Sequence, residues 1–174
     1  MRRFGLGMLL AALTMPVMAV DGYKNLKFGM SPKEVIKTKT CRFGALETDD
    51  NQLQRMSCMD FNFSGGKTFG QALFIDNKLV RVGIMLKDEN QLTSVIKGVS
   101  KKYGEPSTPM SREDFVAVSS MPNQTADVGF DNDTVMLRLM SDANYNQTYL
   151  LMYTVNNYDQ LLDEIAAKAN SDDL

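Results

Sequence analysis

The sequence predicts an α+β fold, in which an antiparallel β-sheet has helices packed on one face. Residues 89–103 carry apolar side chains on one helical face, whereas several shorter segments alternate between apolar and polar residues. Turn-forming residues separate neighbouring strand-like segments by only a few positions, which favours antiparallel pairing. Because a helix followed by a meander occurs twice, residues 20–87 and 88–170 are candidate pseudo-repeats within a single domain, 20–174.

Residues 1–19 are typical of a cleaved signal peptide. Arg2 and Arg3 precede an apolar run, 4–15, that is too short to span a bilayer of ~30 Å, and small residues stand at the −3 and −1 positions of a cut after Ala19. Residue 20 is Val and not the Cys that lipid attachment requires. We therefore expect a soluble periplasmic protein with no stable membrane insertion after signal cleavage.

Composition and charge exclude several classes of function. The 174-residue chain has 19 basic and 21 acidic residues, so removing Arg2 and Arg3 leaves 17 against 21, a net charge near −4. Proteins that follow a nucleic-acid backbone need the opposite sign, so no nucleic-acid partner is expected. The chain has no histidine, which excludes catalytic triads that use an imidazole. The sequence predicts no catalytic residue, no cofactor and no metal site.

Cys41 and Cys58 are the only cysteines, and they predict a structural disulfide. An even count in an exported chain favours pairing. A zinc site would need two further Cys or His ligands, and the Cys-x-x-Cys spacing of a redox pair is absent.

The first half of the mature chain predicts a short helix and three strands. Residues 20–30 suit a short strand or an irregular leading segment. Ser31 can cap a helix that has Pro32 in its first turn, and Glu34 completes a capping box. A polar loop is expected at 44–56, closed by the disulfide. The three predicted strands are 58–63, 69–75 and 79–86.

The second half begins with the best helix signal in the chain. Asp88 suits the N-cap of helix 89–103, and Gly104 with Pro106 ends it. A loop is expected at 105–112. Strand-like segments follow at 115–118, 126–130, 135–140 and 148–155, and a closing helix runs from Asn157 or Asp159 to Ala169.

The last strand has two apolar faces. Its residues divide into one set of Tyr149, Leu151 and Tyr153 and another of Leu150, Met152 and Thr154. This pattern favours a central strand beneath a helix. The alternative is that one face forms a protein-binding surface, since Tyr and Met are enriched at interfaces.

Two short motifs carry a family resemblance. LKFGMSPKEV (26–35) and KKYGEP (101–106) resemble the helix start and helix exit of small bacterial exported proteins of the SmpA/OmlA and beta-lactamase-inhibitor-protein-like fold. The resemblance implies a domain that binds other proteins without chemistry, and it implies an accessory role in envelope assembly.

These observations favour a non-catalytic periplasmic protein that binds another envelope or secreted protein. One version is an immunity protein or enzyme inhibitor whose interface includes Glu47, Asp49 and Asp50 in the disulfide-closed loop 42–57. A second is an accessory factor in envelope or outer-membrane assembly. The alternatives from other classes are a small-ligand carrier and a small hydrolase with a carboxylate or Ser94–Lys97 site.

Asp131 and Asp133 have the spacing of calcium-loop ligands. Asp and Asn are also the residues that turns prefer, so a turn is favoured and cation binding remains an open alternative.

Overall fold

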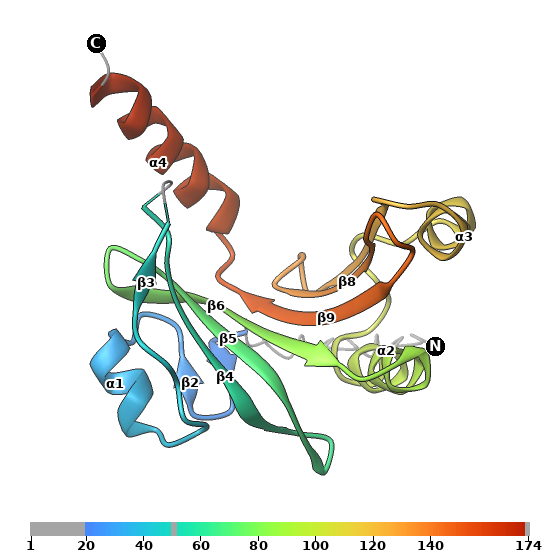
Figure 1. Ribbon diagram of the computed structural model, residues 1–174, viewed down its shortest axis with the longest axis horizontal. Helices are drawn as coiled ribbons and strands as arrows, with labels where there is room; N and C mark the ends of the chain where they lie inside the picture. Colours follow the sequence, from blue (N-terminus) through green and yellow to red (C-terminus); the bar gives the residue numbers. More distant parts are fainter. Residues whose placement is uncertain (1–19, 50–51, 173–174) are drawn as a thin grey trace, which may run out of the picture.

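The computed structural model of the protein describes residues 20–49 and 52–172 and has an α+β fold (Figure 1). Within these residues, seven strands form one antiparallel sheet in the order β3-β4-β5-β6-β9-β8-β7, and two more form a small hairpin. The predicted fold class is confirmed, and the predicted signal peptide lies outside the described residues. The strands are β1 (Gly22–Tyr23), β2 (Leu26–Lys27), β3 (Glu47–Thr48), β4 (Gln54–Phe63), β5 (Gly66–Ile75), β6 (Lys78–Leu86), β7 (Thr125–Phe130), β8 (Val135–Ser141) and β9 (Gln147–Thr154).

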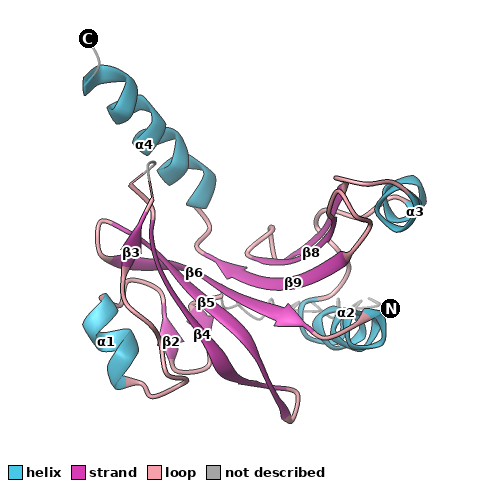
Figure 2. Ribbon diagram, in the orientation of Figure 1, coloured by secondary structure: helices cyan, strands magenta, loops and turns pink. Residues whose placement is uncertain are grey.

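Four helices are present in the described part of the chain (Figure 2). They are α1 (Pro32–Lys37), α2 (Glu89–Tyr103), α3 (Arg112–Ser120) and α4 (Tyr158–Asp172). The predicted capping box of α1 is confirmed, because Ser31 N donates to Glu34 Oε2 at 2.8 Å and Ser31 Oγ accepts from Glu34 N. The N-cap of α2 is also confirmed, because Asp88 Oδ1 accepts from Gln91 N at 2.9 Å.

The two halves of the chain meet in the middle of the sheet. β4, β5 and β6 form one meander and β7, β8 and β9 form the other. Their last strands, β6 and β9, pair with each other, with Val82 opposite Tyr153. β9 is therefore a central strand. Each meander follows a helix, but the structure does not test whether the halves are repeats.

The predicted strand at 115–118 is wrong, because these residues belong to α3. Ser111 Oγ accepts from Asp114 N at 3.0 Å, so a side-chain cap begins a helix just before this segment. Phe115 N donates to Ser111 O at 3.2 Å, which is the i→i−4 hydrogen bond of an α-helix. The run of apolar residues at 115–118 suggested a strand, but it is too short to distinguish a strand from a helix without the cap.

The predicted loop at 44–56 is wrong in part. Residues 47–48 form β3, and β4 begins at Gln54, four residues before Cys58. Glu47 lies opposite Arg55 in this pairing. Residues 50–51, between β3 and β4 in the sequence, lie outside the described residues. β4 begins before the predicted strand because polar residues can also join a sheet. Their backbone N–H and C=O groups form hydrogen bonds with the neighbouring strands.

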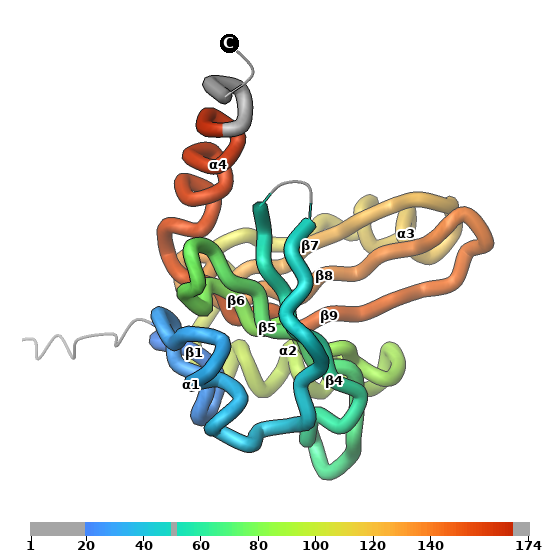
Figure 3. Tube along the Cα trace, turned by 60° about the vertical axis from the view of Figure 1, so that its left-hand side comes forward, coloured from blue at the N-terminus to red at the C-terminus, as the bar shows by residue number. Residues whose placement is uncertain are grey.

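One face of the sheet carries the main core. Buried apolar side chains on this face contact Val35 of α1 and Leu92 and Val99 of α2, and Leu26 of the small hairpin joins them. α4 packs elsewhere, on a separate cluster that includes Ile75 and Val80. Figures 1 and 3 show α1 and α2 on one side of the sheet and α4 projecting from the other. The face opposite α1 and α2 is therefore covered at one end only.

Candidate functional site

The candidate site is the part of the sheet that lies opposite α1 and α2, which we call the open sheet face. It encloses a cavity of about 200 Å³. Cross-strand register places Gln71, Gly83 and Met152 in one row across β5, β6 and β9. Most of the lining side chains are half-buried, so they are neither core nor fully solvated surface. The lining residues are Phe69, Gln71, Leu73, Arg81, Gly83, Arg138, Met140, Leu150 and Met152.

Arg81 stands near the covered end of the open sheet face. It lies on β6 opposite Leu73 of β5 and Thr154 of β9, and its Nε donates to Thr154 Oγ1 at 3.2 Å. Its guanidinium carbon is 3.7 Å from the ring centroid of Tyr158, in the first turn of α4. This stack and one neutral hydrogen bond hold the guanidinium in place without neutralising it.

No carboxylate of the described residues lies within ion-pair distance of Arg81. Asp159 and Asp127 attract it only from a longer range. Burial lowers the pKa of the Arg81 guanidinium from its ordinary value, but a guanidinium stays protonated in a protein. The cavity therefore contains a half-buried positive charge.

Arg138, the second cation of the open sheet face, is already paired. Its Nε and one terminal nitrogen donate to the two oxygens of Asp127, at 2.8 and 2.7 Å. This bidentate hydrogen bonding raises the pKa of Arg138. Arg81 and Arg138 carry two positive charges and Asp127 carries one negative charge. Together these three groups have a net charge of +1, although the chain as a whole is acidic.

The apolar residues around Arg81 come from alternation in β9. Tyr149 and Leu151 point into the main core, whereas Leu150 and Met152 line the open sheet face. The prediction of a central strand is confirmed, but Leu150 is half-buried and belongs to neither of the two core clusters of the described residues. The arrangement provides apolar contacts and one unpaired cation. The lining residues include no carboxylate and no thiol among the described residues.

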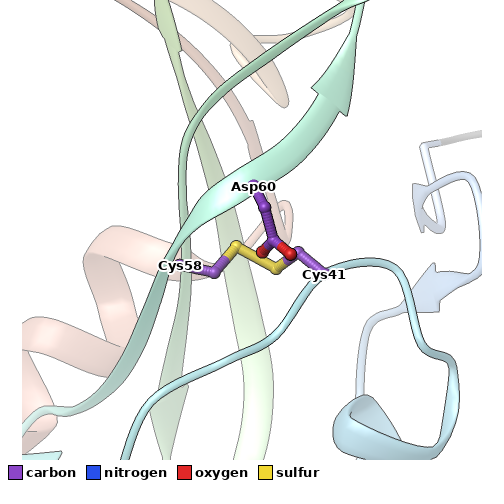
Figure 4. Close-up of side chains that lie close together, drawn as sticks. All are labelled: Cys41, Cys58 and Asp60. Carbon is purple, nitrogen blue, oxygen red and sulfur yellow. A yellow bond between two sulfur atoms is a disulfide. The ribbon is translucent and has the colours of Figure 1, made fainter.

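The predicted disulfide between Cys41 and Cys58 is confirmed (Figure 4). It fastens segment 41–44 along β4, where Gly44 N donates to Ser57 O at 2.8 Å. Asp60 lies beside the two sulfurs. Both sulfurs are bonded to each other, so neither is a thiolate ligand, and Arg42 pairs with Asp60 at 2.9 Å. These three residues suit a structural role.

Two of the three predicted interface residues, Glu47 and Asp49, lie among the described residues. Glu47 is exposed on β3, whereas Asp49 accepts from Leu53 N at 2.9 Å and pairs with Arg55 at 3.0 Å. Asp50 lies outside the described residues. Whether Glu47 and Asp49 contact a partner stays a prediction.

Asp131 and Asp133 serve the turn between β7 and β8. Asp131 Oδ2 accepts from Thr134 Oγ1 at 2.8 Å. The carboxylate of Asp133 accepts from Ser107 Oγ at 2.6 Å and Thr108 Oγ1 at 2.8 Å. These hydroxyl contacts account for both side chains, and cation binding is untested.

The Ser94–Lys97 pair suggested for hydrolysis lies on an exposed part of α2, and the carboxylate version stays a prediction. Ser94 and Lys97 are both exposed on α2, on the side away from the buried Leu92 and Val99. A dyad needs its serine and base within hydrogen-bond reach in a sheltered cleft. Nothing in the surroundings of Ser94 provides that shelter.

Two surface hollows flank the exposed side chain of Ile36 on α1. One, of about 500 Å³, lies between α1 and segment 44–46, and the other, of about 630 Å³, lies beside Cys41 and Arg42. Most of the residues around the first are exposed. A ligand there would remain largely in water, whereas small-molecule sites bury most of their ligand.

The sequence analysis missed Arg81 and Arg138. A signal was available, because each is the single charged residue inside an otherwise apolar run, 79–86 and 135–140. A charge there must lie on the open face of its strand. The sequence could not show that α4 would place Tyr158 against Arg81.

No helix of the described residues is long and apolar enough to cross a membrane. The fold and site define an α+β protein with a partly uncovered sheet face that bears an apolar cavity and an unpaired arginine. The chain belongs to a protein family described as "Uncharacterised protein", which matches residues 23–173. It is 30% identical over 167 residues to an "Uncharacterized protein" of Haemophilus influenzae, which covers 95% of this chain and 94% of the relative. No solved structure matches the chain.

Proposed function

We infer that the protein is a non-catalytic binding protein of the bacterial envelope and that the open sheet face captures another protein. The observation that carries this proposal is that half-buried Leu150 and Met140 line the same cavity as Arg81, which has no ion-pair partner among the described residues. Interfaces concentrate binding energy in a few apolar and arginine residues that surround a small pocket.

The size of the cavity favours a protein over a free small ligand. Small-molecule pockets typically enclose ~300–1,000 Å³, so a cavity of about 200 Å³ is below that range. It is suited to one projecting side chain of a partner. The remaining contact area would come from the half-exposed strand residues around it.

The disulfide supports a location outside the cytoplasm. Stable disulfides are rare where cellular thiols are kept reduced. The predicted signal peptide and the bond between Cys41 and Cys58 agree with each other on this point.

Two versions of this function remain as proposals, an inhibitor or immunity protein and an accessory factor in envelope assembly. The first was based on the acidic loop, where Asp49 is now held by Arg55. The open sheet face instead has a positive group, Arg81, near its covered end. A partner segment with a negative charge is therefore favoured in either version.

Site-specific photo-crosslinking in living cells tests the proposal. A benzoylphenylalanine at position 140, in the cavity, is expected to give a discrete protein adduct. The same probe at position 116 of α3, where Val116 is 51% exposed, is the matched control. A discrete adduct at 116 and none at 140 would assign binding to another surface.

A further inference from the structure

We propose that Arg81 is the anchor for an acidic side chain, Asp or Glu, within an apolar segment of the partner protein. This inference rests on the proposed function, because it names the chemistry of what the open sheet face captures. It assigns a specific contact to a residue that the fold leaves half-buried and without a carboxylate partner among the described residues.

The first step of the argument concerns geometry. Tyr158 stacks on Arg81 and Thr154 accepts from its Nε, so the planar group has a fixed position. Its two terminal nitrogens donate to no described residue, and Arg81 lines the cavity. Two parallel donors on one edge of a guanidinium match the two oxygens of a carboxylate.

The second step concerns electrostatics. Arg138 does not need another anion, since both oxygens of Asp127 already accept from it. Arg81 is the cation left to be neutralised, in surroundings that exclude part of the solvent. A charge pair that is partly desolvated is stronger than the same pair on an open surface.

The third step concerns the residues around the anchor. Leu73 lies next to Arg81 on β5, and Met152 and Leu150 follow on β9. Leu73 and Leu150 are half-buried and offer apolar contacts on both neighbouring strands, whereas Met152 is buried. An acidic residue inside a chain can have apolar neighbours on both sides of it, whereas a chain terminus has them on one side only. A partner's internal Asp or Glu is therefore the occupant that fits.

Amide NMR shifts of the purified, disulfide-intact protein test this with three tripeptides at pH 7. Acetyl-Leu-Glu-Leu-amide carries the side-chain carboxylate, and acetyl-Leu-Gln-Leu-amide is its neutral match. Acetyl-Leu-Gln-Leu with a free carboxyl end carries only the terminal carboxylate. We expect the Glu peptide to shift the amides of Gly83 and Met152 and to bind about tenfold or more tightly than the neutral peptide.

The variant Arg81→Gln should lose this preference, while Arg112→Gln on the exposed start of α3 should keep it. Arg81→Lys keeps the charge but loses the planar pair of donors, so part of the preference should remain. The comparison of peptides on the unmodified protein needs no variant, so an unstable Arg81 variant would not remove the test.

Equal binding of the Glu and Gln peptides would overturn the anchor and leave capture of an apolar segment intact. Tighter binding of the peptide with the free carboxyl end would replace the internal acid with a chain terminus. If no peptide shifts the open sheet face while position 140 still crosslinks a partner, the anchor fails and the proposed function stands. If position 140 also gives no adduct, both fail.

Discussion

The guanidinium of Arg81 lies 3.7 Å from the ring centroid of Tyr158, and this contact joins a central strand of the sheet to the first turn of α4. Leu161, Leu162 and Ile165 of the same helix are only partly buried against the cluster around Ile75 and Val80. The position of α4, and with it one wall of the open sheet face, therefore depends strongly on Tyr158.

We expect Tyr158→Ala to lower the free energy of unfolding by about 2–4 kcal/mol, because a buried ring is removed. Tyr158→Phe keeps the ring and should change it by less than about 1 kcal/mol. Urea unfolding followed by circular dichroism measures both. Equal destabilisation by the two variants would assign the effect to the hydroxyl group and contradict the stacking account.

The disulfide is expected to stabilise the fold through the 17-residue separation of its two cysteines. Replacing Cys41 and Cys58 together with Ser should lower the free energy of unfolding by about 3 kcal/mol on the chain-entropy estimate. A reducing agent should destabilise the unmodified protein and leave the serine variant unchanged. Equal stability of the oxidised protein and the serine variant would show that the bond is dispensable.

Gly70 is expected to tolerate no side chain, because a Cβ there would overlap the ring of Phe61 across the strand pair. Phe61 is fully buried and cannot move aside cheaply, so Gly70→Ala should cost about 1–3 kcal/mol of unfolding free energy. Gly98→Ala is the matched control. Gly98 is exposed in α2 with open space around it, and that change should stabilise the protein by about 0.5–1 kcal/mol. If Gly70→Ala leaves the free energy of unfolding unchanged, the ring of Phe61 does not lie against Gly70.

The cap of α3 gives a direct test of the element that the sequence analysis mistook for a strand. Ser111→Ala removes the acceptor for Asp114 N and should lower the free energy of unfolding by about 1 kcal/mol. Ser119 lies exposed in the same helix and bonds only within it, so Ser119→Ala should stay within about 0.5 kcal/mol. Thermal unfolding followed by circular dichroism compares them. If Ser111→Ala and Ser119→Ala lower the free energy of unfolding equally, the helix does not begin at this cap.

Most of the elements could be predicted because their signals are local. Ser31 and Asp88 cap helices through side chains three positions from the groups they bind, and such spacing is visible in sequence. The alternation of Tyr149 and Leu151 with Leu150 and Met152 likewise showed that β9 has two apolar faces. The disulfide followed from the number of cysteines.

The candidate site could not be predicted in the same way because it depends on long-range pairing. Arg81 and Thr154 are 73 residues apart, and β6 meets β9 only when the two meanders join. The sequence also could not show that Asp49 pairs with Arg55. The charge of each residue is visible in the sequence. Which charged residues pair with each other depends on the register of the sheet, which the sequence does not show.

Co-purification from cells tests the central claim most directly. The account predicts that Leu150→Glu, which puts a negative charge on the open sheet face, reduces recovery of the partner at least tenfold. Val116→Glu on α3 should leave recovery unchanged, and both variants must show the unfolding midpoint of the unmodified protein. If a partner is recovered equally with Leu150→Glu and lost with Val116→Glu, the open sheet face is not the binding surface.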